Sequence, residues 1–534
     1  MHHLFIEYVY LILAILALVM IANKLQLAYP ILLVIGGLAL SFLSEFSNIT
    51  INPELVFFIF LPPLLYEAAW QMSWKEFWKW RRVITSFAFP IVILTACVIA
   101  YVSVALIPGF TLALGFLLGG IISPPDAISA TTIMRQVKAP KSMVSIAEGE
   151  SLLNDASSLI VFRFALAAVI TGQFYFQEAA VSFVTVVVMG IATGLLTGLL
   201  FYSIHRWLPV TPSVDIVLTL VTPYCMYYFA EYFHFSGVLA VVSGGLFLSH
   251  RRQTILSYKS RIQSVNVWTS LVFMLNGLVF MLIGLQLPSI MAQLGDVSVA
   301  KATFYGVVIS AALILTRLIC ALGASLFTRI MSNFITVADP NPGWKSPLIL
   351  GWAGMRGVVS LAAALSIPLL IDETHVFPYR SLILFITFIV ILITLVFQGL
   401  TLPWLVRILN IEKKPDVKTE QEQEQIIQKK LAHYSLLFIK EKHGEERLKN
   451  EHLHNLRTKL ETELKFFNEV LDPDITTGNA LQEFHSTYLE LLGEQRRVLD
   501  EMNHHAEFDE DLIRKYLALV DFEELKVRER NLEV

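Results

Sequence analysis

Charged residues are scarce in this chain of 534 residues. Asp, Glu, Lys and Arg make up 16% of it and hydrophobic residues 55%, a balance that is unusual for soluble proteins. Apolar runs of about 20 residues, the length that crosses a hydrocarbon layer of roughly 30 Å, recur throughout residues 1–410. The sequence therefore predicts an all-α polytopic membrane protein. It excludes a β-barrel, whose segments would be shorter and would alternate in hydrophobicity.

Sulfur ligands and nucleotide-binding motifs are also missing. The three cysteines, Cys97, Cys225 and Cys320, lie singly in apolar runs, without the spacing of a disulfide framework or a metal site. We interpret them as packing residues. No phosphate-binding loop of the G-x-x-x-x-G-K-[ST] type occurs, which argues against an ATP-driven pump. We expect no cofactor, no ATP and no nucleic acid as partners of this chain; the partners expected are membrane lipids.

The few charges are unevenly distributed. Residues 1–410 carry 21 Lys/Arg and 16 Asp/Glu, a net charge of +5, whereas residues 411–534 carry 19 and 28, a net charge of −9. This contrast predicts a transmembrane domain over 1–410 and a separate tail over 411–534. The tail is rich in Glu, Lys, Gln and Leu and is predicted to be helical, with a regulatory or dimer-stabilising role.

Thirteen transmembrane segments are predicted in the first domain. The N-terminal one lacks the basic region of a signal peptide, so we interpret it as a membrane span. With the N-terminus outside, sixteen lysines and arginines fall at inner loops and span ends, against only Lys301 and Arg380 outside. This asymmetry indicates an N-terminus outside the cell membrane and a cytoplasmic tail. The predicted segments are about 4–22, 27–44, 53–72, 83–107, 111–133, 143–171, 180–203, 214–232, 236–250, 265–290, 302–328, 347–369 and 379–408.

Two of these segments contain helix-breaking residues. The fifth includes 123-SPPDAIS-129, where two prolines remove backbone donors, and the twelfth includes 351-GWAGMRGVVS-360, with three glycines. Freed backbone groups at membrane depth are tolerated only inside protein or around a wet cavity. A pair of interrupted helices, one in each half of the chain, is typical of a transporter's midplane binding site.

Ionisable residues inside the membrane are costly, so each is a candidate functional residue. On the sixth segment, Ser151, Asp155 and Ser158 share one helix face, and Glu150 and Asn154 lie on the adjoining one. Carboxylate, hydroxyl and amide oxygens are ligands suited to a hard cation. The candidates within the predicted segments are Glu67, Asp126, Glu150, Asp155, Arg163, Arg317 and Arg356.

Asp155 is the expected carrier, because one carboxylate in a partly dehydrated cavity can bind either a proton or a cation. Asp126 is expected either to bind the cation or to stabilise the helix break, and Glu67 either to bind it or to form a structural hydrogen bond. Glu150 is expected to pair with an arginine, with Arg356 as the favoured partner. Arg163 and Arg317 are expected to form structural pairs, and Glu148 to be a solvated end.

Four motifs together resemble the sodium/proton exchangers of the monovalent cation:proton antiporter superfamily. They are 61-LPPLLYEA-68, 123-SPPDA-127, 149-GESLLNDASSLIVFRFAL-166 and 351-GWAGMRGVVSLA-362. The resemblance is to the branch that bacterial antiporters share with animal exchangers, and it covers the whole predicted membrane domain. Animal members usually place a proline after the aspartate of the second motif, whereas Ala127 stands here, which favours a bacterial origin.

The resemblance implies an inverted-repeat fold, two crossing broken helices and a homodimer. It implies that Asp155 carries the cation (Na⁺, Li⁺ or K⁺) and the proton, that Asn154 and Ser151 support the site, and that Asp126 and the backbone at Pro125 line it. It implies a contribution from Glu67 and a core ion pair between Glu150 and Arg356. The residues themselves, and not the resemblance, make Ser158, Arg163 and Arg317 accessory candidates. Asn at position 154 implies electroneutral one-for-one exchange.

Two other functions remain open from the residues alone. A cation channel would use the same acid-lined cavity, but no filter-like repeat occurs. A membrane sensor that signals through the tail would need an output domain, and none is recognisable.

Overall fold

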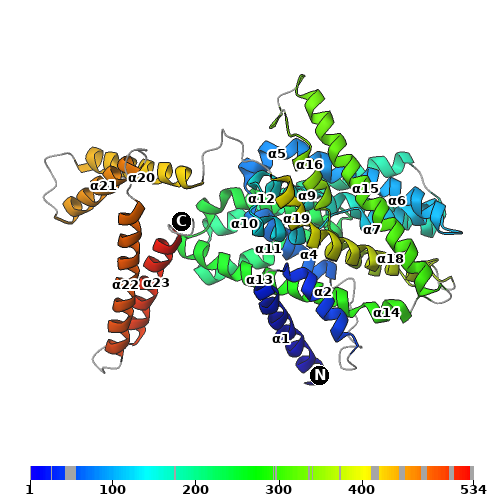
Figure 1. The fold of residues 1–534 in the computed structure, drawn as a ribbon, viewed down its shortest axis with the longest axis horizontal. Helices are drawn as coiled ribbons and strands as arrows, with labels where there is room; N and C mark the ends of the chain where they lie inside the picture. The colour runs from blue at the N-terminus through cyan, green and yellow to red at the C-terminus, as the bar shows by residue number, and fades with distance from the viewer. Residues whose placement is uncertain are drawn as a thin grey trace. The chain divides into compact units, whose positions relative to one another are not determined.

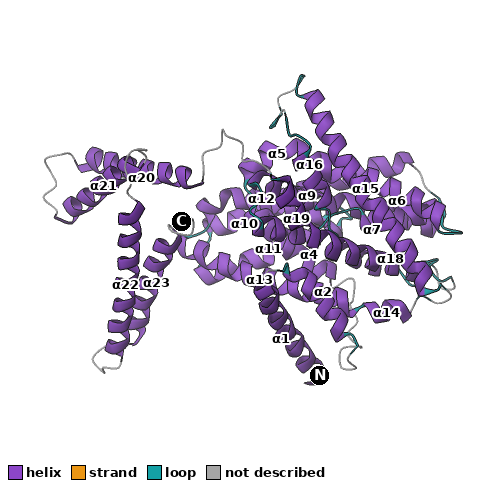
Figure 2. Ribbon diagram, viewed as in Figure 1, coloured by secondary structure: helices purple, strands orange, loops and turns teal. Residues whose placement is uncertain are grey.

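The computed structural model consists of helices and connecting loops (Figure 2). Within the residues it describes, extended pairing is limited to an isolated bridge between Leu370 and Val376. The chain forms two compact units, Met1–Ile411 and Glu412–Val534, which are described separately. The described residues are 2–25, 27–42, 56–173, 176–292, 294, 297–334, 337–339, 341–371, 375–410, 420–443, 451–470, 478–503 and 510–529.

Each of the thirteen predicted segments overlaps one helix or consecutive helices of the first unit (Figure 1). Residues 43–44 and 53–55 of the second and third predicted segments lie outside the described residues. Among the described residues, seven helices are long and apolar enough, by length and composition, to cross a membrane, and three shorter helices are also apolar. The bounds are α1 (His2–Leu25), α2 (Tyr29–Leu40), η1 (Val56–Phe60), α4 (Leu61–Gln71), α5 (Trp74–Ser86), η2 (Phe87–Ile91), α6 (Val92–Leu106), α7 (Leu112–Ile122), α8 (Ala127–Gln136), α9 (Lys141–Thr171), α10 (Phe176–Trp207), α11 (Pro212–Tyr232), α12 (Gly237–Ile255), α13 (Tyr258–Leu285), α14 (Leu287–Ala292), α15 (Val299–Met331), α16 (Lys345–Trp352), α17 (Val358–Leu365), α18 (Arg380–Ile393), η3 (Thr394–Gln398) and α19 (Gly399–Leu409).

The helices of this unit pack as two bundles. The first bundle contains α1, α2, α4 and α10 to α13, with the closest packing between α10 and α12 and between α2 and α13. The second contains α5 to α9 and α15 to α19, with α7 packed between α6 and α9. Fewer contacts join the two bundles, mainly through α9 with α12 and α4, and through α13 with α17.

The helix predicted to begin near residue 83 begins nine residues earlier, at Trp74. The Ser73 side chain accepts a hydrogen bond from the Glu76 amide, a Ser-x-x-Glu pattern that stabilises a helix start. Pro90 lies inside the same helix, and the backbone adopts a π-helical turn over Phe87–Ile91 there. Because the helix remains continuous through this turn, Trp74–Leu106 forms one rod of 33 residues.

Both predicted interruptions are present. α7 ends at Ile122, and α8 starts at Ala127 with Asp126 as its N-cap. α16 ends at Trp352, and α17 starts at Val358 after a non-helical stretch that contains Arg356. Each interruption leaves a helix C-terminus and a helix N-terminus facing each other inside the unit.

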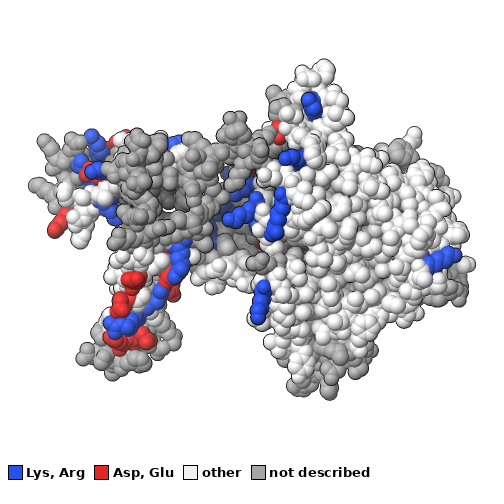
Figure 3. All heavy atoms as spheres, viewed as in Figure 1, with Lys and Arg blue, Asp and Glu red and all other residues white. Residues whose placement is uncertain are grey.

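The surface of the first unit is largely uncharged on the face in Figure 3. Large apolar side chains are exposed along α10, such as Val181 (69% exposed) and Leu196 (68%). An extensive exposed apolar surface is what a lipid environment requires, since lipid covers it at no cost.

The described part of the C-terminal unit forms the helices α20 (Glu420–His443), α21 (Glu451–Val470), α22 (Gly478–Asn503) and α23 (Glu510–Glu529). The predicted helical character of the tail is confirmed for these ranges. α22 packs on α23, where Arg496 bonds Asp521 at 2.8 Å and also pairs with Glu524. Hydrogen bonds from Arg528 and Arg496 hold the pKa of Glu524 below its usual range.

The close packing of α2 on α13 makes a prediction about Gly284. A Cβ at this position would collide with the carbonyl oxygen of Val34, whereas a Cβ on Gly323 of α15 would meet nothing within 4 Å. Gly284→Leu should therefore cost more than the roughly 1–3 kcal/mol of ordinary overpacking, because backbone would have to move. Size-exclusion chromatography of detergent-solubilised protein should show loss of the monodisperse peak for Gly284→Leu. The matched control Gly323→Leu should elute as the wild type does, and equal behaviour of the two variants would contradict the packing.

Candidate functional site

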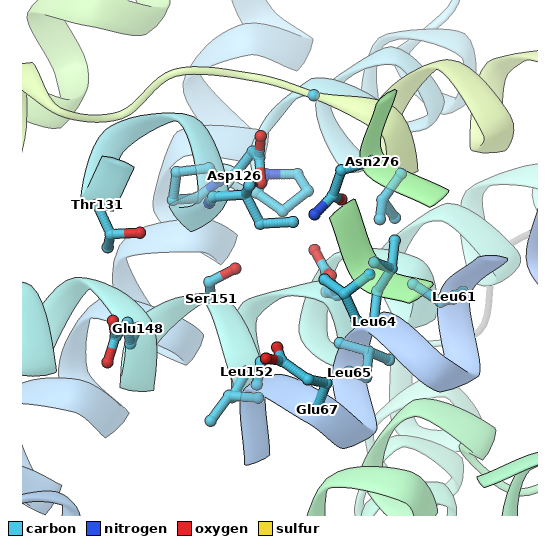
Figure 4. A pocket seen from close by; sticks show the side chains of 18 of the residues that line it. Leu61, Leu64, Leu65, Glu67, Asp126, Thr131, Glu148, Ser151, Leu152 and Asn276 are labelled. Atoms are coloured by element: carbon cyan, nitrogen blue, oxygen red, sulfur yellow. Dashed lines mark hydrogen bonds between the residues drawn. The ribbon is translucent and has the colours of Figure 1, made fainter. Parts of the chain in front are cut away.

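A cavity of about 300 Å³ lies where α4, α8, α9, α13 and α17 meet. Figure 4 shows polar side chains from several of these helices around it. Four carboxylates line it, against one basic residue, Arg135. The acidic and other polar residues of the lining include Glu67, Gln71, Asp126, Thr131, Thr132, Glu148, Ser151, Asp155, Asn276 and Ser360.

The two interrupted helices meet beside this cavity. The Asp126 amide donates a hydrogen bond to the Met355 carbonyl oxygen at 2.7 Å, which joins the non-helical stretch of one to that of the other. The Asp126 carboxylate accepts bonds from the Ile128 amide (3.1 Å) and the Ser129 hydroxyl (3.0 Å) at the start of α8. Gly357 lies so close that a Cβ there would collide with this carboxylate. The two predicted helix breaks are present and meet at the bond between Asp126 and Met355.

The structure shows the stabilising role considered for Asp126, and its cation-binding role stays a prediction. Asp126 caps α8, where the positive end of the helix dipole favours a carboxylate. It also lines the cavity, so it can contribute to a cation site.

Asp155 is buried, with 7% exposure, and lines the cavity together with Ser151, one turn earlier on α9. The shared face predicted for these two residues is confirmed. Ser158 is different: its hydroxyl donates to the Asp155 backbone carbonyl at 3.1 Å, and it is not part of the cavity lining. The hydroxyl of Ser158 is used by its own helix, so the expectation that it faces the site is not met.

Asn154 is not part of the cavity lining but contacts the broken segment next to it. Its side-chain amide donates to the Pro125 carbonyl oxygen at 2.9 Å, a group that the break between α7 and α8 leaves without a helical partner. This bond fixes the broken segment against α9, next to Asp155. The resemblance implied a supporting role for Asn154 and a backbone role for Pro125, and the contact between them fits both.

Glu67 reaches the cavity from α4, in the first bundle, and accepts a hydrogen bond from Gln71. The two roles considered for it, cation ligand and structural hydrogen bond, are thus compatible. Glu148 is more than a solvated end, because it lines the cavity and pairs with Arg135 at 2.5 Å.

The predicted pair of Glu150 with Arg356 is wrong. Glu150 accepts two parallel hydrogen bonds from Arg317 of α15, at 2.8 and 2.9 Å, and both side chains are buried. Arg356 donates instead to the carbonyl oxygens of Ile122 (2.5 Å) and Gly354. These carbonyls lie at the C-terminal ends that the two breaks create, where a cation is favourable. Arg356 therefore binds the carbonyl oxygens that the helix breaks set free, and Glu150 binds Arg317.

Arg163 and Arg317 both form ion pairs, as predicted. Arg163 of α9 bonds Glu231 of α11 at 2.7 Å, and the Arg163 side chain is 47% exposed. Glu231 also accepts a bond from the Gly237 amide at 3.2 Å. The Arg163–Glu231 pair joins the two bundles outside the cavity lining. Arg317 is also absent from this lining.

Sequence analysis missed Asn276 of α13 and Ser360 of α17, which also line the cavity. Asn276 is 3% exposed, and its side-chain oxygen has no hydrogen-bond partner within the described part of the chain. A signal was present, because Asn276 is the only strongly polar residue in the apolar run 271-LVFMLNGLVF-280. Asn276 has no ionisable residue near it on its own helix, whereas Asn154 and Ser151 were found because they lie next to Asp155 and Glu150.

The arrangement provides oxygen ligands of both kinds that an alkali cation needs, ionised and neutral. Within the described residues, no group of three or more His, Cys, Asp and Glu has the geometry of a metal centre. The lining instead suits a weakly held cation that can enter and leave.

A family model for the transmembrane domain of sodium/hydrogen exchangers matches residues 11–408. The chain belongs to the sodium/hydrogen exchanger family. It is therefore a multi-pass membrane protein of a transporter family, and not an enzyme. The resemblance inferred from the four motifs is confirmed.

Exchanger relatives and solved structures show how far the similarity extends. A sodium, potassium, lithium and rubidium/H⁺ antiporter of Bacillus subtilis is 33% identical over 411 residues, covering 74% of this chain and 60% of the relative. The chain thus spans about 60% of the length of the Bacillus relatives that it matches. A Na⁺/H⁺ antiporter of Aphanothece halophytica is 31% identical over 72% of this chain and 70% of its own. The structure of a sodium proton antiporter from Methanocaldococcus jannaschii, 18% identical, aligns with a TM-score of 0.59 over 77% of this exchanger and all of that chain, which shows the same fold.

The Glu150–Arg317 pair of this exchanger makes a prediction about stability. Glu150→Gln or Arg317→Gln alone should cost roughly 3–5 kcal/mol, because each leaves an uncompensated buried charge. The double variant Glu150→Gln/Arg317→Gln should recover much of this loss. Melting temperatures measured by loss of the monodisperse chromatographic peak would test both statements.

Arg163→Gln is the matched control, because the half-exposed Arg163–Glu231 pair should contribute about 1 kcal/mol or less. A wild-type melting temperature for Arg317→Gln would show that Glu150 depends on another partner.

Proposed function

We propose that this exchanger is a secondary antiporter that trades a monovalent cation for H⁺ by alternating access, with Na⁺ as the main cation and Li⁺ or K⁺ as others. The observation that carries the proposal is the position of Asp155: a buried carboxylate on the wall of an acid-lined cavity, beside the crossing of two broken helices. The names of the Bacillus and Aphanothece relatives support the choice of cations.

Competition for one carboxylate is the core of the mechanism. Protonated Asp155 gives its proton to water in the cavity, and the resulting carboxylate binds the cation with oxygens of Ser151, Asp126 and Glu67. Asn154 holds the Pro125 carbonyl in place during this exchange. Because either a proton or a cation neutralises Asp155, the loaded site carries the same charge in both directions.

The proposed topology is thirteen spans with an inverted repeat, an N-terminus outside the cell membrane and a cytoplasmic tail. Gln71, Glu148 and Arg135 line the cavity, and the positively charged loops around Lys75 and Lys138 are close to them in sequence. The cavity therefore opens toward the cytoplasm under the positive-inside rule. We also propose a homodimer, which the resemblance of the four motifs to sodium/proton exchangers implied.

Asp155→Asn should abolish exchange, because an amide side chain, unlike a carboxylate, cannot take up and release a proton. The measurement is cation-driven proton movement in proteoliposomes, followed with a pH-sensitive dye for Na⁺, Li⁺ and K⁺ separately. Ser158→Ala is the matched control: it is one turn away on α9 but outside the cavity lining, so it should retain wild-type exchange. Normal exchange by well-folded Asp155→Asn protein would refute the assignment.

The transport rate should not depend on membrane voltage, because one cation is exchanged for one proton. Setting the potential of the proteoliposomes with a potassium gradient and valinomycin, at equal internal and external pH, tests this for Na⁺ and Li⁺. A rate that follows the voltage would contradict one-for-one exchange. A steady cation current without proton movement would identify a channel instead.

A further inference from the structure

The basic residues of helix α5 are among those that set the predicted orientation, and the lining of the transport cavity includes none of them. The sequence of α5, 74-WKEFWKWRRVITS-86, contains three tryptophans and four basic residues but a single acid. Lys75, Lys79 and Arg82 are spaced by four and three residues, and so share one face of the helix. Trp74, Trp78 and Arg81 have the same spacing one position earlier and form the adjoining face. Like charges on one face destabilise a helix, so folding alone does not favour this pattern.

These two faces are exposed except at Arg81, whose side chain is half-buried. Trp74 and Trp78 are 42% and 54% exposed, and their rings stack with centroids 5.8 Å apart. The Arg81 guanidinium lies over the Trp78 ring at 4.5 Å. The acid of this helix, Glu76, accepts a hydrogen bond from the Trp80 indole at 3.1 Å. Within the described residues, no ion pair to a carboxylate is found for Lys75, Lys79 or Arg81.

The length of the helix places these residues beyond the hydrocarbon layer. Trp74–Leu106 is a continuous helix of 33 residues, which corresponds to roughly 50 Å at about 1.5 Å per residue. The hydrocarbon core is about 30 Å thick, and a tilt of about 20° shortens the projection only slightly. Since 92–106 is apolar throughout, the excess length falls at the α5 end. The two faces therefore lie at the depth of the lipid headgroups.

The end of α12 adds further positive charge at the same place. The His250 ring lies 6.0 Å from the Trp74 ring, and the exposed Arg251 and Arg252 follow it directly. We define the basic–aromatic patch as Trp74, Lys75, Trp78, Lys79, Arg81, Arg82, Arg251 and Arg252.

We propose that the basic–aromatic patch binds the headgroup of an anionic phospholipid. Lysine and arginine side chains form charge-assisted hydrogen bonds with phosphate oxygens, and tryptophan side chains favour the interface between headgroups and acyl chains. Charge complementarity and the depth of the patch both select a lipid over a soluble anion. α5 packs on α9, which carries Asp155, whereas α12 belongs to the other bundle. A headgroup bound here contacts both bundles.

Quenching of tryptophan fluorescence by brominated lipids tests this proposal without any transport measurement. The full chain is reconstituted in phosphatidylcholine vesicles that contain a minor fraction of either brominated phosphatidylglycerol or brominated phosphatidylcholine. The wild type should show stronger quenching by the anionic lipid, and raised salt should reduce the difference. In Lys75→Gln/Lys79→Gln/Arg81→Gln protein the difference should be lost. In Trp74→Phe/Trp78→Phe protein the difference should become smaller, because two of the nine tryptophan reporters are gone while the charges remain.

Arg329→Gln/Lys345→Gln/Arg407→Gln is the matched control, since it removes three positive charges from other helices and should keep the wild-type difference. Equal quenching of the wild type by the two lipids would overturn the proposal. A difference that survives in the charge-depleted α5 variant, or that disappears in the control variant, would overturn it as well. Soluble glycerol phosphate should not abolish the difference; if it does, the patch binds a free anion and the lipid assignment fails.

Discussion

The hydrogen bond from the Asp126 amide to the Met355 carbonyl is the contact on which the site depends. Two helices interrupted inside an apolar body leave backbone donors and acceptors that must find partners there. The chain satisfies them with one another and with three side chains: the Asp126 carboxylate caps α8, Asn154 binds the Pro125 carbonyl, and Arg356 binds the carbonyls of Ile122 and Gly354. The polar cavity beside Asp155 exists because these bonds hold the breaks open.

This requirement also explains the division of labour among the buried charges. Arg356 donates to carbonyl oxygens at the C-terminal ends of two broken helices, where a cation is favourable. Glu150 is then free to take Arg317, a bidentate pair that ties α9 to α15. A direct pair of Glu150 with Arg356 would have left the freed carbonyls and Arg317 without compensation, and buried groups of that kind are costly.

The cost of charge in a membrane predicted much of the site, since it pointed to Asp155, Asp126 and Glu67 and to both helix breaks. Helical spacing alone could not decide whether Arg317 or Arg356 pairs with Glu150, because both arginines are buried and neither lies on the same helix as Glu150. Spacing also placed Ser158 beside Ser151, although a hydroxyl in a helix can bond its own backbone, and that of Ser158 does. The early start of α5 depended on a serine cap within a sequence rich in tryptophan and lysine, where hydropathy falls too low to indicate a span.

The distribution of the site between the two bundles has a mechanical consequence. The bonds of Asn154 with Pro125, Asp126 with Met355, Glu150 with Arg317 and Arg356 with Ile122 all lie within the second bundle. Glu67 and Asn276 reach the cavity from the first bundle. The second bundle can therefore move as a body past the first without breaking any of its own buried bonds. Such a movement changes only the wall that Glu67 and Asn276 present to Asp155, and it must strain or release the half-exposed pair of Arg163 with Glu231 that joins the bundles. The strong bonds thus preserve the geometry around Asp155, and the weak one lies where alternating access requires motion.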